Sequence, residues 1–323
     1  MKRLLSVLWL AAAVALQGAP PAGAQDYPSK PIRAIGGSAP GGISDVFIRT
    51  LGEELHKRWG QPIVVENRPG GTFNIGARAC AEAPPDGYTI CILPNEPMTY
   101  NPHLFKTLPF DPDKSFEPIT NLFFIVQVLA VNSSLNAKTL EQLAAVSKAR
   151  PNTLSYSSPS LALVLFLESF KRETGADMVR VPFKGGGDAV TGLLSGTTPV
   201  VFIGVGNLLA HLRSGAATGL VMESAQRSPL FPDIPTLSEL GYRGDFTRAY
   251  FGLYAPAGTP KAIVHKIRDE VARIVSEPGF RDKNLVQRGL EPVLSTPDEF
   301  ARFLKQDREI AGRIVRESGI APQ

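Results

Sequence analysis

The residues with the clearest capacity for chemistry form a glycine-rich turn at residues 38–45, with the sequence SAPGGISD. It follows a short apolar run at residues 32–35 and opens a segment with helical periodicity. The first turn of a helix leaves backbone N–H groups unpaired and carries the positive end of the helix dipole. Glycines let that backbone approach a ligand closely. The turn has neither the G-x-G-x-x-G pattern nor the Lys-Ser/Thr of a P-loop, so it predicts a carboxylate site rather than a nucleotide site.

Three further turns have a similar composition. Residues 69–74 (PGGTFN) and 184–188 (KGGGD) are rich in glycine, and residues 157–160 (SSPS) are rich in serine. Tight turns between strands and helices often need glycine, so each turn alone is as consistent with a structural role as with binding. Several in one chain, each opening a helix, favour anion capture. Lys184 could offer a charge to a carboxylate or could be a solvated loop lysine.

Other sources of chemistry are weak in this sequence. The four histidines, His56, His103, His211 and His265, are isolated, and none has a partner at metal-ligand spacing. No G-x-S-x-G motif marks a serine nucleophile. The sequence therefore predicts no catalytic residue, no metal site and no cofactor.

The elements that must position these turns alternate between strand and helix. Residues 32–93 contain three apolar runs, at 32–35, 63–65 and 88–93, separated by two helical segments. A βαβαβ pattern predicts a parallel, doubly wound sheet whose ligand crevice lies at the carboxyl ends of the strands. The middle of the chain repeats this pattern, with expected strands at 122–132, 154–156, 179–183 and 200–203. The end of the chain is predicted to be helical, with Thr259-Pro260 and a Thr296-x-x-Glu299 capping box as helix starts.

The two cysteines, Cys80 and Cys91, fall near the end of a predicted helix and in the strand that follows it. Adjacent elements could bring them within bridging distance, and an oxidising compartment would favour a disulfide. Two buried thiols are an equally good interpretation of the sequence.

The N-terminus has the features of a secretory signal peptide. Residues 1–24 contain Met1-Lys2-Arg3, an apolar stretch at 4–16, and Ala-Gly-Ala before Gln25. About a dozen apolar residues are too few for a membrane span, which needs roughly 20. We expect cleavage near Gln25 and export of the chain to the periplasm.

Composition limits the remaining interpretations. The chain has 323 residues, and close to 300 would remain after cleavage, which favours two domains. Of the 34 Lys and Arg residues, two lie in the signal peptide, so 32 face 30 acidic residues and the net charge is +2. Such a small charge does not support nucleic-acid binding.

The chain resembles the Bug family, the TctC-type periplasmic solute-binding proteins of tripartite tricarboxylate transporters. The similarity covers essentially all of the sequence after the signal peptide. It rests on a series of ordered motifs: YPSKPI at 27–32, APGGxxD at 39–45, VENRPG at 65–70, NIGA at 74–77, PDGYT at 85–89, NP at 101–102, FKGG at 183–186, RSP at 227–229, DIPT at 233–236 and APAGTP at 255–260.

The resemblance implies an α/β fold, a two-domain periplasmic binding protein of the Venus-flytrap, type II-like kind. Two crossover strands near residues 123–131 and 246–255 would link the domains. The first domain would comprise residues 25–125 plus 250–323, and the second residues 126–249.

The resemblance also implies a site. Family members hold a carboxylate between loops of both domains, through backbone N–H groups and ordered waters. The residues carried over to this sequence are Ser38, Pro40, Gly41, Gly42, Ile43, Ser44, Thr72, Phe73, Asn74, Ser157, Ser158, Ser160, Lys184, Gly185, Gly186 and Gly204. Backbone N–H groups at 41–43 and 185–186 would bind carboxylate oxygens, whereas Asp45 would cap or orient its helix, since like charges repel.

Two departures from the family pattern concern the ligand. Residues 158–164 read SPSLALV where glycines and a histidine are common, and residues 199–202 read PVVF where an Asp is frequent. Both remove polar groups, so we expect a ligand with an apolar body, such as an aromatic carboxylate or a longer aliphatic dicarboxylate. Citrate would leave more polar groups unsatisfied.

The sequence therefore predicts a periplasmic protein that captures an organic carboxylate and delivers it to TctA/TctB-like membrane subunits. One alternative is a component that presents its ligand to a sensor kinase. The other is a periplasmic hydrolase, although no nucleophile–base pair is recognisable.

Overall fold

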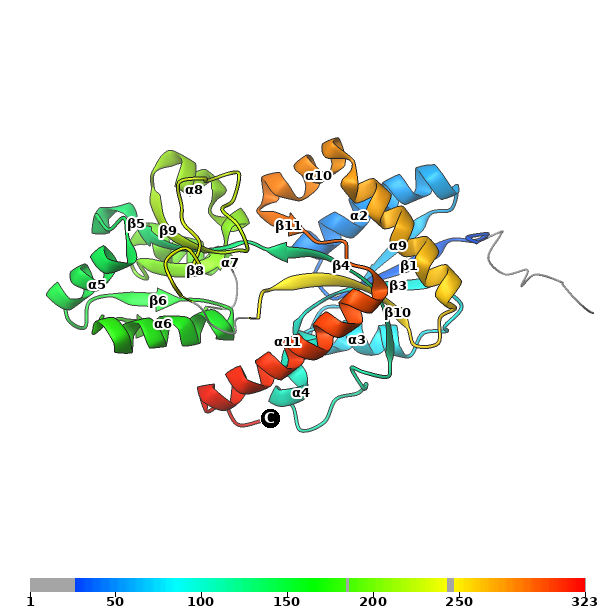
Figure 1. Cartoon of the computed structure of the whole chain (residues 1–323), viewed down its shortest axis with the longest axis horizontal. Helices are drawn as coiled ribbons and strands as arrows, with labels where there is room; N and C mark the ends of the chain where they lie inside the picture. The colour runs from blue at the N-terminus through cyan, green and yellow to red at the C-terminus, as the bar shows by residue number, and fades with distance from the viewer. Residues whose placement is uncertain (1–26, 184–185, 243–246, 323) are drawn as a thin grey trace, which may run out of the picture.

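The computed structural model describes residues 27–183, 186–242 and 247–322. They form two lobes, each built on one mixed β-sheet with helices on both faces (Figure 1). The predicted α/β class and its division around two sheets are confirmed. The predicted signal peptide, Lys184 and Gly185 lie outside the described residues.

The sheet of lobe 1 has six strands in the order β11-β4-β10-β3-β1-β2. Their bounds are β1 Ile32–Gly36, β2 Ile63–Asn67, β3 Thr89–Pro94, β4 Phe116–Ile125, β10 Tyr250–Pro256 and β11 Leu290–Pro292. The first three are mutually parallel through β1, as the βαβαβ pattern predicts, whereas β10 runs antiparallel to both β3 and β4.

Successive residues along a strand point to opposite faces of the sheet. In lobe 1 both faces carry apolar residues, so helices cover both. On β1, Ile32 and Ala34 belong to one apolar cluster and Ile35 to another. The first cluster includes α2 (Ile43–Trp59), α9 (Lys261–Ser276) and α10 (Pro278–Asn284), and the second includes α3 (Asn74–Ala81) and α11 (Pro297–Ser318). The predicted capping box at Thr296 and Glu299 is present at the start of α11.

The sheet of lobe 2 has five strands in the order β7-β6-β8-β5-β9. Their bounds are β5 Gln127–Asn132, β6 Ser155–Ser157, β7 Val179–Arg180, β8 Val200–Gly204 and β9 Ala217–Glu223. Helices α5 (Leu140–Ala149) and α6 (Leu161–Thr174) pack on one face, and α7 (Gly186–Ser195) and α8 (Leu209–Ser214) on the other.

Some elements differ from their prediction. The long strand expected at 122–132 is two strands, β4 and β5, in different sheets, with Val126 between them. The strand expected at 179–183 is only the two-residue β7, which is exposed and so lacks the burial that extends a strand. A π-helical turn, η1 (Glu96–Tyr100), and the short α4 (Asn101–Leu104) follow β3 without a predicted counterpart.

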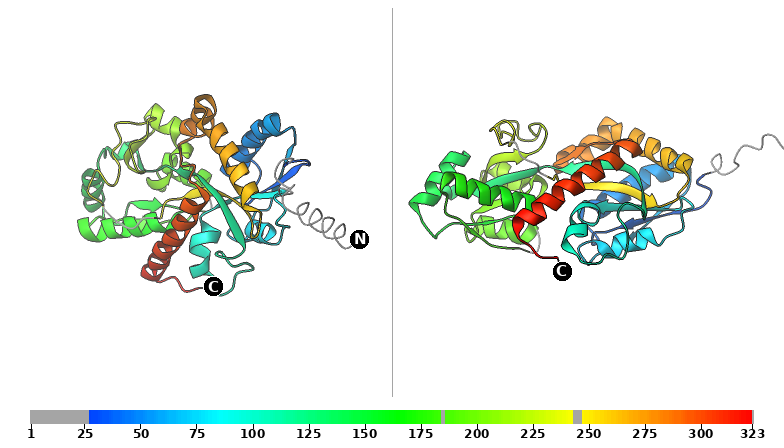
Figure 2. Two further views of the ribbon diagram at one scale, coloured as in Figure 1. Left: turned by 45° about the vertical axis from the view of Figure 1, so that its right-hand side comes forward. Right: turned by 60° about the horizontal axis from the view of Figure 1, so that its bottom comes forward.

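Among the described residues, contacts join the lobes at the connecting residue Val126 and at α11. The Val126 amide donates to the Gly289 carbonyl (3.0 Å), and the Val205 amide donates to the Val126 carbonyl (2.8 Å), so one residue binds both lobes. On the opposite side, α11 of lobe 1 reaches α6 of lobe 2 (Figure 2), where apolar residues of both helices form one cluster.

The structure joins Cys80 of α3 to Cys91 of β3 in a disulfide, with both residues buried. The sequence left a bridge and free thiols equally open. The two positions are 11 residues apart, and closing a loop of that length stabilises the native state by about 3 kcal/mol in the chain-entropy treatment.

We expect a Cys80→Ala/Cys91→Ala variant to lose about 3 kcal/mol of unfolding free energy, measured by urea titration. Dithiothreitol should produce a loss of similar size in the wild type and none in the double variant. A reductant effect equal in both proteins would contradict the assignment of this stability to the bridge.

Candidate functional site

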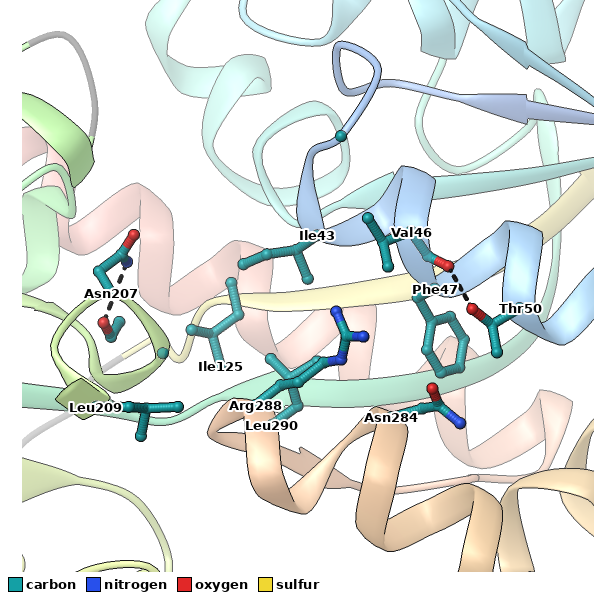
Figure 3. A pocket seen from close by; sticks show the side chains of 13 residues that line it. Ile43, Val46, Phe47, Thr50, Ile125, Asn207, Leu209, Asn284, Arg288 and Leu290 are labelled. Atoms are coloured by element: carbon teal, nitrogen blue, oxygen red, sulfur yellow. Dashed lines mark hydrogen bonds between the residues drawn. The ribbon is translucent and has the colours of Figure 1, made fainter.

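A cavity of about 250 Å³ lies between the two lobes (Figure 3). Lobe 1 contributes the start of α2, the end of β4 and residues from the end of α10 to the start of β11, and lobe 2 contributes residues from the end of β8 to the start of α8. The lining residues are Gly41, Ile43, Val46, Phe47, Thr50, Ile125, Asn284, Arg288 and Leu290 from lobe 1, and Gly204, Gly206, Asn207 and Leu209 from lobe 2.

The start of α2 presents unpaired donors at this cavity. The Gly41 amide donates to Asp45 Oδ2 (2.8 Å) and the Gly42 amide to the Ala39 carbonyl (3.1 Å), so both are occupied within the turn. The first helical bond runs from the Val46 amide to the Gly42 carbonyl. The amides of Ile43, Ser44 and Asp45 make no hydrogen bond to any residue that the structure describes. Of the amides expected at 41–43 to bind a carboxylate, only that of Ile43 remains available.

Asp45 holds the turn in shape. Its carboxylate accepts hydrogen bonds from the Gly41 amide, Arg49 Nε (2.9 Å) and Asn67 Nδ2 (2.9 Å), and its side chain is buried. Burial alone would raise the pKa of Asp45, but the hydrogen bonds from Arg49, Gly41 and Asn67 together keep it below its ordinary value. Asp45 is therefore an ionised residue that orients the loop, as predicted.

The expected hydroxyl groups of lobe 1 are also engaged. Ser44 Oγ donates to Ser38 Oγ (2.7 Å), and Ser44 is fully buried. Since Asn67 Nδ2 donates to the Ser38 carbonyl (3.0 Å), the turn is fastened from β2 as well. Pro40 lies at the exposed tip of the same turn.

The second glycine turn lies beside the first but does not line the cavity. Thr72 and Phe73 adopt left-handed backbone conformations, with φ of 51° and 68°, before α3 begins at Asn74. Asn101 Nδ2 donates to the Thr72 carbonyl (2.8 Å) and to Asn74 Oδ1 (2.7 Å). The side-chain oxygen of Asn74, which was expected to bind ligand, therefore accepts a hydrogen bond from Asn101 instead. Asn101 holds the turn in place through Thr72 and Asn74.

In lobe 2, the expected residues divide between the cavity and its surroundings. Gly204 lines the cavity, whereas Ser157 and Ser158 are buried and Ser160 donates its amide to Ser158 Oγ (3.3 Å). Gly186 lies against Asn207, because a Cβ there would approach Asn207 Oδ1 to 2.8 Å. The described end of the third glycine turn thus adjoins the lining through Asn207.

The two apolar departures from the family pattern serve packing. Ala162 forms a cluster with Tyr100 and with Ala311, Ile314 and Val315 of α11. Phe202 packs against Phe166 in the core of lobe 2, with ring centroids 5.9 Å apart. Neither segment lines the cavity of about 250 Å³, whereas Ala162 lines a separate cavity between α6 and α11. The contact with α11 and the core of lobe 2 account for their apolar character, and a role of these replacements in ligand choice stays a prediction.

The apolar part of the cavity comes from other residues. Ile43, Val46 and Phe47 form one side of it, and Ile125, Leu209 and Leu290 contribute from three separate elements. In the sequence these residues look like ordinary core positions of helices and strands. No local pattern indicates that they meet around one cavity.

Arg288 is a lining residue that the sequence analysis missed. It ends the short helix η4 (Val286–Arg288), in a segment where only structural helices were expected. It is the one ionisable side chain among the lining residues, and it makes no hydrogen bond or ion pair with any described residue. A single arginine before a glycine carries no motif, so spacing alone could not have identified it.

The described residues contain no candidate metal site. Across residues 27–183, 186–242 and 247–322, no group of three or more His, Cys, Asp or Glu side chains could hold a metal ion. Nor is any helix of this part of the chain long and apolar enough to cross a membrane.

Comparisons with known proteins agree with this architecture. The profile of TctC, the Tripartite tricarboxylate transporter family receptor, matches residues 47–320. Protein BugT of Bordetella pertussis is 33% identical over 99% of this chain and 98% of its own length.

Two solved structures are similar over nearly the whole chain. One is an R. palustris protein with adipate, at 27% identity and a TM-score of 0.78, covering 92% of this chain and 100% of the other. The other is MatC from Rhodopseudomonas palustris with bound malate, at 29% identity and a TM-score of 0.72, covering 90% and 100%. From the family profile and the similarity to BugT, it follows that the chain belongs to the TctC (Bug) family of periplasmic solute-binding proteins.

Proposed function

We propose that this chain binds a small organic carboxylate between its lobes and delivers it to TctA/TctB-like membrane subunits of a tripartite transporter. The observation that carries the proposal is the set of unpaired amides at Ile43, Ser44 and Asp45, at a helix start whose Gly41 and Ile43 line the cavity. Unpaired N–H groups and the helix dipole together favour an anion at this point.

The ligand body is proposed to be apolar, either aromatic or a longer aliphatic chain. The support comes from the six apolar side chains around the cavity. A volume of about 250 Å³ lies just below the range of ~300–1,000 Å³ typical of small-molecule sites, which suits a small acid. Adipate and malate, which are bound in the two similar structures, are acids of this size class.

Capture would require the lobes to move relative to each other. We propose that residues 25–125 plus 250–323 form one moving domain and residues 126–249 the other. The change of sheet at Val126 supports the first boundary, and the second falls just before β10. Hinge closure around a ligand is a common mode of motion for two-lobed clefts. Export of the protein through cleavage of residues 1–24 completes the proposal.

The role of the Ile43 amide in carboxylate binding can be tested with a substitution that removes this N–H group. An Ile43→Pro substitution removes this donor at the first helical position, where proline is well tolerated, and Gly42 already has the extended conformation (φ −68°, ψ 164°) that precedes proline. We expect Ile43→Pro to weaken carboxylate binding at least about tenfold relative to Ile43→Ala, which keeps the N–H, because a hydrogen bond to a charged group contributes ~1.5–3 kcal/mol.

Calorimetric titration with adipate, malate, benzoate and citrate provides the measurement, with adipamide as the uncharged control. Failure of every acid to bind would refute the carboxylate function. A clear preference for citrate would contradict the apolar ligand body but leave the carboxylate site intact.

A further inference from the structure

The cavity between the lobes contains a positive charge, that of Arg288, which pairs with no residue described in the structure. Arg288 is exposed, and Figure 3 shows its side chain pointing from η4 into the cavity, in the direction of α2. Two other arginines nearby are engaged: Arg248 binds Glu223 and Glu291, and Arg268 donates to the Leu294 and Ser295 carbonyls. The guanidinium of Arg288 has no such partner among the described residues.

The backbone of Arg288 is fixed at the junction of the lobes. The next residue, Gly289, has φ of +72°, and its carbonyl accepts the Val126 amide. The loop of lobe 2 is so close that a Cβ on Gly206 would lie 2.7 Å from the Arg288 carbonyl oxygen. The main chain therefore cannot shift far, whereas the long side chain can turn within the cavity.

The side chains between Arg288 and the start of α2 are mostly apolar. Ile43, Val46 and Phe47 lie on one side and Ile125 and Leu290 on the other, while the polar lining residues, Thr50, Asn207 and Asn284, are uncharged. A ligand with an acidic group at each end of a largely apolar body would match both the unpaired amides and the guanidinium. A guanidinium presents paired N–H donors that match the two oxygens of a carboxylate.

We infer that Arg288 is a specificity-determining residue that binds a second carboxylate, so that the protein selects linear α,ω-dicarboxylates over monocarboxylates of the same length. The inference rests on the proposed carboxylate-binding function and names the ligand class of that site. Binding of one ligand carboxylate at the start of α2 gives the affinity that monocarboxylates and dicarboxylates share. Binding of the second carboxylate by Arg288 gives the preference for dicarboxylates.

The test compares adipate with hexanoate, which has the same chain length and lacks one carboxylate, on the wild type and on Arg288→Gln, Arg288→Lys and Arg281→Gln. Arg281 is an exposed arginine of α10 that does not line the cavity, so its substitution removes one charge from the same region. We expect Arg288→Gln to weaken adipate binding about ten- to hundredfold, as for a hydrogen bond to a charged group, and to leave hexanoate binding unchanged.

Arg288→Lys should fall between the two, because an ammonium keeps the charge but not the paired geometry, and Arg281→Gln should match the wild type. A thermal scan checks that each variant is folded. If hexanoate binds as tightly as adipate, or if Arg288→Gln weakens both equally or neither, the role of Arg288 is refuted while the carboxylate function stands. If no acid binds the wild type, the proposed function itself fails and the role of Arg288 with it.

Discussion

Replacing Arg248 with methionine is expected to lower the free energy of unfolding at pH 8 by roughly 3–5 kcal/mol, the loss typical of breaking a buried ion pair from one side. Arg248 precedes β10 at the second connection between the lobes. Its Nε donates to Glu223 Oε1 (3.0 Å) at the end of β9, and its terminal nitrogens donate to the carboxylate of Glu291 in β11 (2.7 and 3.3 Å). Its guanidinium also lies over the ring of Phe124, 4.1 Å from the centroid.

Stability is lost because the Arg248 guanidinium pairs with one carboxylate in each lobe. The Glu223 side chain is only 7% exposed, and its Oε2 has no partner among the described residues. Burial raises the pKa of Glu223 to about 7, with Glu291 adding to the rise, even though Arg248 opposes it. Without Arg248 the pKa of Glu223 would rise further, so the variant must keep Glu223 protonated, or bury an unpaired charge, at a pH where the wild type ionises it. At pH 5 Glu223 is protonated with or without Arg248. The loss should therefore be smaller at pH 5 than at pH 8.

Urea titrations of Arg248→Met, Glu223→Gln and the double variant at both pH values provide the measurement. Glu223→Gln should recover part of the loss when combined with Arg248→Met, because the buried charge is then absent. Arg227→Met is the matched control, since Arg227 pairs with Glu239 on the exposed surface of lobe 2, where a much smaller loss is expected. Equal losses for Arg248→Met and Arg227→Met, or the same loss at both pH values, would contradict the argument.

Local patterns were sufficient to predict the elements that surround the site. Glycine turns followed by apolar periodicity placed the starts of α2 and α3 within a residue or two, because turn chemistry and helix amphipathicity are short-range properties. The role of Asp45 was also predictable, since a carboxylate in the first turn of a helix interacts with nearby amides.

The contacts between the lobes could not be predicted in the same way. Arg248 meets acids 25 and 43 residues away, and Arg288 reaches a cavity whose other walls come from α2 and lobe 2. The apolar residues around Ala162 show why polarity alone misleads: the sequence reveals that a face is apolar but not whether it meets a ligand or α11. Which groups converge is decided by tertiary packing.

A second large effect is expected from Asp307 of α11 when the pH changes. The side chain is 3% exposed, and its Oδ2 has no partner among the described residues. Burial raises the pKa of Asp307 from 3.8 to about 7, against the smaller effects of a hydrogen bond accepted from Thr99 and of the charge of Arg308. The folded protein thus keeps a proton that the unfolded chain releases above about pH 4.

The contribution of Asp307 to the free energy of unfolding should consequently be greatest near pH 4. It should decrease as the pH rises to 7. The slope is about −1.4 kcal/mol per pH unit, which over roughly three units amounts to ~4 kcal/mol. Asp307→Asn removes this titration and keeps the size of the side chain. Its free energy of unfolding should match that of the wild type near pH 4 and exceed it by up to ~4 kcal/mol at pH 8.

Urea titrations at intervals between pH 4 and 8 measure both curves. Asp298→Asn, an exposed position in the first turn of the same helix, serves as the control and should leave the slope of the wild type unchanged. Some decline should persist in Asp307→Asn, because the buried carboxyl of Glu223 loses its proton over an overlapping range. Parallel curves for Asp307→Asn and the wild type would instead mean that Asp307 is ionised in the folded protein and that the charge of Arg308 compensates it.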